Sequence, residues 1–245
     1  MRRTQRLPLE ELAPYLWEAQ DRRPAGSISS DAANASTEEE QTPGLLPPVS
    51  GLPPPASPID WQTIFRNSNP VEIEVGCGKG LFIVNAAQSC PDVNFFGIEI
   101  VRKYQLYTAT RVAIRKLANV RMACADAKPI LRDCVPLGSV QAIHVYYPDP
   151  WWKKRHHKRR LFTPDFVESC TKALKTGGLF HLATDVEEYF AVMIDLCRQR
   201  SELRELPAPQ LSTGKHDMDY LTNFERKARK KGQPVFRALF EKIAA

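Results

Sequence analysis

An acidic residue and a glycine turn lie together near the middle of the sequence. Glu74 is the fourth residue of a short apolar run over 71–75, and Gly76 and Gly78 follow this run with one residue between them. Glycine lets the backbone take positive φ angles and approach a ligand closely, and a helix after such a turn offers free N–H groups. A carboxylate here would repel a pyrophosphate but suits a ligand that carries an ammonium and a sulfonium group. The GxGxG spacing with this acid therefore favours S-adenosylmethionine over a dinucleotide, for which GxGxxG is typical.

Two further acids follow the next two expected strands. Glu99 falls at the end of a strand predicted over 94–100, and Asp126 follows a strand predicted over 120–125. Strand ends line the ligand crevice of a doubly wound sheet. A carboxylate at 99 can accept both hydroxyls of a ribose, and a short acid at 126 can accept from an adenine amino group. Each acid alone could be a helix cap or a surface residue, but three at successive strand ends favour a cofactor site.

A strand predicted over 142–147 runs into the most unusual segment of the chain. Asp149 lies between Pro148 and Pro150, which restrict the backbone on both sides. Two tryptophans and eight basic or potentially basic residues follow, over 151–160. Aromatic faces beside positive charge suit bases and phosphates. A targeting patch or a solvated loop is the alternative, but the place of this loop opposite the glycine turn favours a substrate role, with Asp149 as the candidate catalytic residue.

Alternating strands and helices are expected to position these residues. Apolar residues at helical spacing predict helices over 81–88, 103–117, 164–174 and 189–200, the third ended by Gly177 and Gly178, and a further strand is predicted over 179–184. Such alternation is typical of an α/β fold with a mostly parallel sheet and helices on both faces.

The N-terminal part has a different composition. Residues 24–58 hold eight prolines and few large apolar residues, which predicts a disordered linker. A proline-rich ligand for a partner domain is the alternative. Residues 1–23 form a short arm whose apolar residues, Leu9, Leu12, Leu16 and Trp17, have helical spacing and could form a docked helix. We therefore divide the chain into an arm and linker, 1–58, and a domain, 59–245, which we expect to fold alone.

Charge and cysteine spacing narrow the function classes. The net charge is +6, and the segment 24–58 carries four acids and no Lys or Arg, so the rest is more basic than the whole. This favours an anionic partner. Six cysteines without a CxxC pair predict neither a metal site nor a disulfide framework. No apolar run approaches the roughly 20 residues of a membrane span, and acids in the arm argue against a presequence, so we expect a cytoplasmic protein without a membrane partner.

The segment from Pro148 to Arg160 resembles the signature of the bacterial tRNA (guanine-N7)-methyltransferases, which methylate guanosine 46 in the tRNA variable loop. The likeness extends over residues 70–243, and residues 1–58 match nothing in that family. The resemblance implies a Rossmann-like class I methyltransferase fold, S-adenosylmethionine as cofactor, tRNA as partner, and a monomer or homodimer. It implies cofactor contacts from Glu74, Glu99, Asp126 and Asp149, beside the turn glycines Gly76 and Gly78, and substrate contacts from Lys153, Asp185, Thr222, Asn223, Phe224 and Glu225.

The acceptor atom indicates what the site must do. Guanine N7 carries a lone pair and no proton, so no histidine base is required, and alignment supplies much of the acceleration. Asp149 could stabilise positive charge on the purine or hold its N1–H and amino edge. Competing hypotheses are a methyltransferase for ribosomal RNA or protein, a noncatalytic RNA-binding protein, and a nucleotide-dependent dehydrogenase. A second basic cluster over 226–231 is either a solvated helix face or a phosphate contact.

Overall fold

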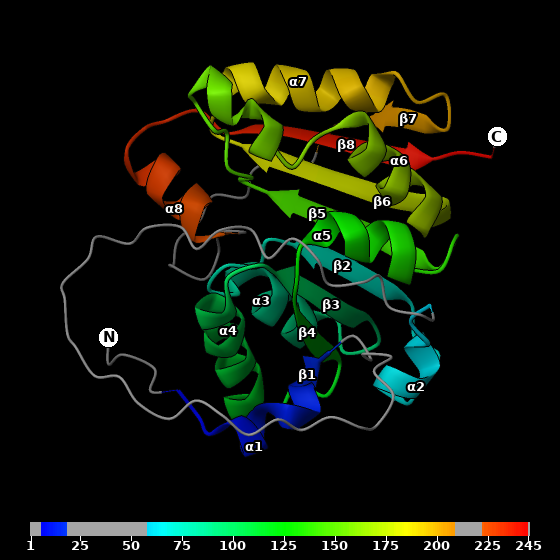
Figure 1. Cartoon of the computed structure of the whole chain (residues 1–245), viewed down its shortest axis with the longest axis vertical. Helices are drawn as coiled ribbons and strands as arrows, with labels where there is room; N and C mark the ends of the chain where they lie inside the picture. Colours follow the sequence, from blue (N-terminus) through cyan, green and yellow to red (C-terminus); the bar gives the residue numbers. More distant parts are fainter. Residues whose placement is uncertain (1–5, 19–57, 209–221, 245) are drawn as a thin grey trace, which may run out of the picture.

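The computed structural model describes residues 6–18, 58–208 and 222–244. The strands in these ranges form one sheet, in the order β1-β4-β3-β2-β5-β6-β8-β7 (Figure 1). They are β1 Leu16–Trp17, β2 Val71–Val75, β3 Asn94–Glu99, β4 Val120–Cys124, β5 Val140–Tyr146, β6 Leu174–Thr184, β7 Leu203–Leu206 and β8 Phe236–Lys242. Neighbours from β1 to β6 pair in parallel, whereas β8 is antiparallel to β6 and β7. The predicted mostly parallel sheet is confirmed.

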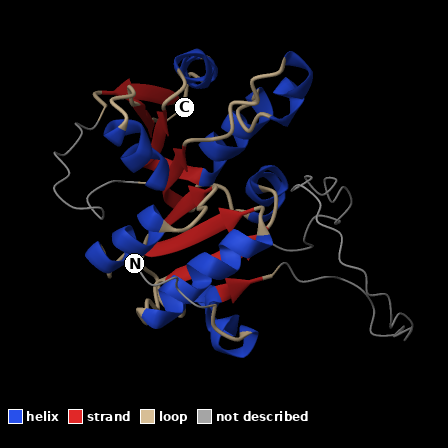
Figure 2. Cartoon of the chain, turned by 90° about the vertical axis from the view of Figure 1, so that its left-hand side faces the viewer, coloured by secondary structure: helices blue, strands red, loops and turns tan. Residues whose placement is uncertain are grey.

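Helices cover both faces of this sheet (Figure 2). The α-helices are α1 Leu9–Leu12, α2 Trp61–Phe65, α3 Leu81–Ser89, α4 Arg102–Ile114, α5 Ala127–Pro129, α6 Pro164–Ala173, α7 Glu187–Arg198 and α8 Asn223–Lys230, with shorter helical turns η1 Ala13–Tyr15, η2 Ile130–Cys134 and η3 Lys154–Arg159. Ile83 of α3 and Val112 of α4 belong to one buried apolar cluster with Met122 of β4. Phe166 of α6 and Met193 of α7 belong to a second cluster. None of the helices in the described ranges is long and apolar enough to cross a membrane.

The predicted elements of the domain lie within about three residues of the observed ones, except where α6 meets β6. The two glycines at 177 and 178 do not follow the helix, because β6 begins at Leu174 and runs through them. The pairing of β5 with β6 shifts here, from Val140↔Leu174 to Ala142↔Leu179. Glycine in a strand commonly marks such a bulge, and Gly177 has a positive φ of 77°. The pair Gly177-Gly178 therefore marks an irregularity in β6 and does not end the preceding helix.

The arm packs against the domain and supplies β1, an edge strand of the sheet. Leu12 is fully buried beside α3 and α4, and β1 pairs in parallel with β4. The expected docked helix is confirmed only over Leu9–Leu12, because a tighter turn that contains Pro14 begins at Ala13, and Leu16 and Trp17 are extended. Trp17 packs edge-on against Phe96 of β3, with ring centroids 5.5 Å apart. Residues 19–57, with nearly all of the expected linker, lie outside the described residues, and independent folding of 59–245 stays a prediction.

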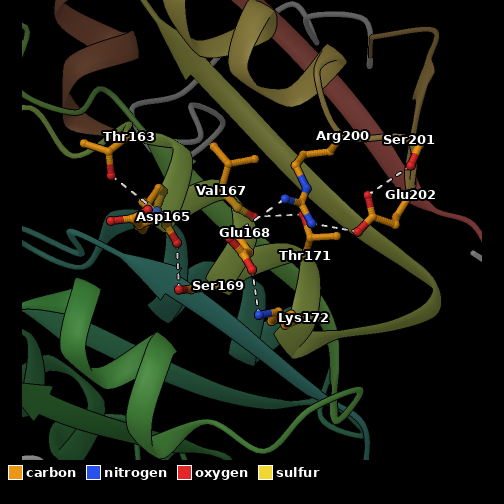
Figure 3. Close-up of polar contacts among 11 residues, drawn as sticks. Thr163, Asp165, Val167, Glu168, Ser169, Thr171, Lys172, Arg200, Ser201 and Glu202 are labelled. Carbon is orange, nitrogen blue, oxygen red and sulfur yellow. Dashed lines mark hydrogen bonds and ion pairs between the residues drawn. The ribbon is translucent and has the colours of Figure 1, made fainter.

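Polar contacts join α6 to the end of α7, on the face remote from α3 and α4 (Figure 3). Thr163 caps α6 by accepting a hydrogen bond from the N–H of Phe166, as expected for an N-cap threonine. Glu168 pairs with Lys172 at 2.6 Å and lies 3.9 Å from Arg200. Arg200 in turn pairs with Glu202, just before β7. Exposed pairs each contribute little, so this network adds little to the stability of the fold.

The buried leucine of the arm gives a direct test of its docking. We expect Leu12→Ala to lower the free energy of unfolding by about 2–5 kcal/mol, the usual cost of a large-to-small change in a core. Leu9→Ala is the matched control, because Leu9 lies in the same helix and is 49% exposed. It should change stability by less than about 0.5 kcal/mol. Denaturant unfolding measures both, and equal effects of the two changes would mean that the arm does not pack on the domain.

Candidate functional site

Parallel strands bring five predicted site acids to one edge of the sheet. Each lies in or just after the carboxyl end of a strand: Glu74 in β2, Glu99 in β3, Asp126 after β4, Asp149 after β5 and Asp185 after β6. The chain passes from β2 outward to β3 and β4 and then returns to the other side of β2 at β5. Ligands of open α/β sheets bind at such a reversal of strand order. Glu99 and Asp126 therefore lie on one side of this reversal, where a ligand crevice is expected, and Asp149 and Asp185 lie on the other.

The glycine turn after β2 leaves open space at this edge. Gly76 and Gly78 have positive φ angles of 78° and 52°, and a Cβ added to either would meet no heavy atom within 4 Å. A ligand can thus approach the bare backbone. Gly80 has a different role, because a Cβ there would collide with the side chain of Thr108. It allows the start of α3 to pack against α4.

The carboxylate of Glu99 connects the two turns that border the crevice. One oxygen accepts a hydrogen bond from the N–H of Gly78 at 2.7 Å, and the other accepts from the N–H of Val101 at 2.8 Å. Burial raises the pKa of Glu99, these hydrogen bonds oppose the rise, and the nearby charge of Asp149 adds to it. A carboxylate has about four acceptor positions, so Glu99 keeps capacity for ligand hydroxyls.

Glu74 is buried without a partner for one of its oxygens. It is 3% exposed, and its Oε2 has no hydrogen-bond partner among the described residues. Burial raises the pKa of Glu74 to about 8, and the charge of Glu99 adds to the rise. An unsatisfied buried acceptor is rare in folded proteins. An ammonium bound at the turn could donate a hydrogen bond to it, so Glu74 fits the ammonium of S-adenosylmethionine, and its charge would also attract the sulfonium.

Asp126 and Asp149 are both exposed but are held differently. Asp126 caps α5, since its Oδ1 accepts from the N–H of Lys128 at 2.9 Å. Asp149 lies in a loop, and a hydrogen bond holds the backbone on each side of it. Before it, the N–H of Tyr147 donates to the carbonyl of Ala183 at 2.7 Å. After it, the guanidinium of Arg160 donates to the carbonyl of Pro150 at 2.8 Å, so both sides of Asp149 are tied to the domain.

The basic segment after Asp149 forms an exposed cationic and aromatic surface. Lys153 and most of η3 are exposed, and Trp152 is 69% exposed. The guanidinium of Arg159 lies over the ring of Trp151, 5.1 Å from its centroid, and the ring of His156 is perpendicular to that of Trp151, with centroids 5.8 Å apart. Such surfaces stack on bases and attract phosphates.

Helix α8 brings the predicted substrate contacts over 222–225 to the side of the crevice where Asp149 lies, which we call the acceptor side. Thr222 caps it by accepting from the N–H of Glu225 at 3.0 Å. Phe224 is 56% exposed and stacks on Tyr147, with centroids 5.9 Å apart. Glu225 is only 2% exposed and pairs with arginines, so its carboxylate faces inward. The side chain of Asn223 lies outside the described residues, and the predicted substrate contacts of all four stay predictions.

Two histidines near the site are packing residues. His144 is buried between Glu72, 2.8 Å away, and the hydroxyl of Tyr146, 3.0 Å away. His181 stacks on it at 4.7 Å. Burial and the neighbouring His144 lower the pKa of His181 to about 3, so it is neutral near pH 7. Within the described ranges no group of His, Cys, Asp and Glu could hold a metal ion.

Four residues support the site, of which only Arg160 was predicted, as part of the basic segment over 151–160. They are Thr108, which donates to the carbonyl of Gly78, Tyr147 beneath Phe224, Arg160 behind Pro150, and Arg237 beside Glu225. Tyr147 borders the Pro-Asp-Pro segment, so proximity in sequence could have marked it. Thr108 and Arg237 reach the site only through tertiary contacts, which local spacing does not reveal.

Comparison with known proteins identifies the family. The model of the family described as "Putative methyltransferase" matches residues 68–238. A tRNA (guanine-N(7)-)-methyltransferase of Rhodopirellula baltica is 43% identical over 75% of this chain and 70% of its own length. One of Alkalilimnicola ehrlichii is 33% identical over 91% of this chain and 95% of its own length. The chain belongs to the tRNA (guanine-N7)-methyltransferase family. The predicted family and its S-adenosylmethionine dependence are thereby confirmed.

Solved structures of other methyltransferases share the fold. The 16S rRNA methyltransferase KamB superposes with a TM-score of 0.55 at 17% identity and covers 74% of this chain and 91% of its own. The 30S ribosomal A1408 methyltransferase from an uncultured bacterium gives 0.53 at 16% identity, with 74% and 91% covered. At this identity the likeness concerns the fold alone, and it confirms the predicted Rossmann-like architecture.

The raised pKa of Glu74 predicts a pH dependence of stability. The unfolded carboxyl loses its proton near 4.5, whereas the folded one holds it to about 8. The free energy of unfolding of the cofactor-free protein should therefore fall as pH rises through this window, by up to about 1.4 kcal/mol per pH unit. Glu74→Gln should flatten the curve, and exposed Glu188→Gln should not. Parallel curves for wild type and Glu74→Gln, from urea unfolding at pH 5 to 8, would show that Glu74 is ionised when buried.

Proposed function

We propose that this protein transfers a methyl group from S-adenosylmethionine to N7 of guanine in tRNA, and that the acceptor is guanosine 46 of the variable loop. The observation that carries the proposal is the position of Asp149, on a tied loop across the crevice from Glu99 and beside the exposed basic segment over 153–160. The relatives from Rhodopirellula baltica and Colwellia psychrerythraea, both named tRNA (guanine-N(7)-)-methyltransferase, support it. A tRNA substrate makes the cytoplasm the expected location.

Residues on one side of the crevice would bind the cofactor. The bound cofactor supplies a methyl group on a sulfonium centre. Glu74 would face its cationic groups and Glu99 its ribose hydroxyls, while Gly76 and Gly78 let it lie against the backbone. Orientation of these groups lowers the barrier because reacting atoms are aligned before reaction.

The acceptor side needs no base, since guanine N7 has no proton to lose. Asp149 faces a purine that gains positive charge during transfer, and a fixed carboxylate there would stabilise that charge or hold the N1–H and amino edge. Asp185 and the α8 cap would complete this side. Lys153 and η3 would hold tRNA phosphates, and the basic residues of α8 are either further phosphate contacts or a solvated face.

Labelled-methyl transfer to a tRNA transcript tests the proposed function. The wild-type transcript should accept label at N7, which chain cleavage after borohydride and aniline treatment locates because N7-methylation makes the base labile. A transcript with guanosine 46 changed to adenosine should accept none. Equal label on both transcripts would identify another acceptor, and transfer to ribosomal RNA alone would refute a tRNA substrate.

Asp149→Asn shows whether this carboxylate acts mainly on the transition state or mainly on the bound cofactor. The change keeps size but removes the charge and replaces one acceptor oxygen by a donor, and the fold should survive because Asp149 is exposed. If the carboxylate stabilises the transition state, the single-turnover rate should fall about a hundredfold or more, on the order of 3 kcal/mol, with a much smaller loss of cofactor affinity. If Asp149 mainly holds the cofactor, affinity loss should account for most of the defect. A normal rate with normal cofactor binding would remove Asp149 from the active site.

The basic segment predicts salt-dependent tRNA binding. In the double variant Lys153→Ala and Arg155→Ala, each lost phosphate contact should reduce the slope of log affinity against log salt by about 0.7–0.9. Lys175→Ala is the control, since Lys175 is exposed near the start of β6, away from the carboxyl edge. Filter binding of tRNA across a salt series measures the slopes. An unchanged slope in the double variant would mean that this loop faces away from RNA.

A further inference from the structure

A buried ion pair joins α8 to strand β8. Glu225 Oε2 lies 2.8 Å from an Nη of Arg237, and Glu225 Oε1 lies 3.2 Å from an Nη of Arg229. The side chains of Glu225 and Arg237 are 2% and 12% exposed. Arg229 belongs to α8 itself, one turn after Glu225, and cannot by this contact fix the helix to another element. The pair with Arg237, by contrast, joins α8 to β8.

A buried ion pair is poor evidence of stabilisation, because desolvation can cancel the attraction. Here it is costlier still, since Nε of Arg237 is buried without a hydrogen-bond partner among the described residues. An apolar contact between α8 and β8 would dock the helix without these costs. What the pair supplies is orientation, because a charged hydrogen bond fixes α8 in one direction relative to β8.

Neighbouring contacts connect this ion pair to the loop that contains Asp149. Arg237 lies opposite Ala183 in the pairing of β8 with β6. The carbonyl of Ala183 accepts the N–H of Tyr147, which holds Tyr147 two residues before Asp149. Phe224 precedes Glu225 in α8 and stacks on the Tyr147 ring, with an interplanar angle of 18°. The helix α8 lies at the edge where the parallel strands end (Figure 1).

We propose that Arg237 is a positioning residue for the acceptor base: by holding Glu225 against β8, it keeps Phe224 stacked on Tyr147, and the two rings form an aromatic wall beside Asp149. Aromatic faces stack on unpaired purines, and more than half of Phe224 is exposed to receive one. The inference rests on the proposed function and adds to it a residue that touches neither cofactor nor base. Tyr147 has φ of 54°, and this uncommon backbone is kept where surrounding contacts hold it.

The test compares Arg237→Met with Arg237→Lys and with a control. Arg204→Met is the matched control, because it breaks a more exposed arginine pair with Glu241 between β7 and β8. Hydrogen exchange should show protection of the α8 amides reduced tenfold or more in Arg237→Met, partly restored in Arg237→Lys and unchanged in Arg204→Met. Protection of β5 and β6 amides should stay normal in all three, which shows that the domain is folded.

Kinetics then connect the docking of α8 to the acceptor. For Arg237→Met we expect a single-turnover rate at least tenfold lower at saturating tRNA, with the dissociation constant for S-adenosylmethionine within twofold of wild type, and for Arg237→Lys an intermediate rate. Normal α8 protection, or a rate within twofold of wild type, would overturn the inference while the proposed function stands. A tenfold weaker cofactor affinity would also overturn it. No transfer to tRNA by the wild-type protein would instead refute the proposed function, and the inference with it.

Discussion

The carboxylate of Glu99 is the contact on which the geometry of the crevice depends. It binds the N–H of Gly78 in the turn after β2 and that of Val101 in the turn after β3. Parallel strands deliver turns to the same edge, and the N–H of Gly76 continues the pairing by donating to the carbonyl of Ile98 at 2.8 Å. Beyond Gly76 the strand pairing no longer joins the two turns. A single buried acid with two acceptor atoms does so. The open backbone at Gly76 and Gly78 and the unpaired oxygen of Glu74 are then held at one place.

The two sides of the crevice differ in charge and in burial. On one side, buried acids lie against bare glycine backbone, and burial raises the pKa of both Glu74 and Glu99. On the other side Asp149 is exposed, and the segment over 153–160 supplies cations that remain solvated. A small cationic ligand can pair closely with buried acids, which offsets the cost of its desolvation, whereas a polyanion gains from a broad exposed surface. The fold separates these requirements by placing them on opposite sides of β2.

Sequence reasoning found the elements and acids that local patterns encode. The predicted strands and helices between 71 and 200 follow apolar spacing, whereas α5, β7 and β8 were not predicted. The acids could be predicted because each lies at or just after the end of a predicted strand. Tertiary contacts decided what it missed. Leu16 and Trp17 have helical spacing but join β4 as a strand, Gly177 bends a strand where a helix end was expected, and Arg237 reaches Glu225 only because β8 lies beside β6. Nothing in the sequence over 222–225 predicts that the side chain of Glu225 faces inward.

Calorimetric titration of S-adenosylmethionine into wild-type protein and Glu99→Ala tests the central claim most directly. The variant should stay folded, because water can reach the N–H groups that Glu99 leaves at the edge of the sheet. It should bind the cofactor at least about tenfold more weakly, since a hydrogen bond to a charged acceptor contributes about 1.5–3 kcal/mol. Unchanged affinity in a folded Glu99→Ala variant would contradict the account, because the acid that organises this edge would then make no contact with the methyl donor.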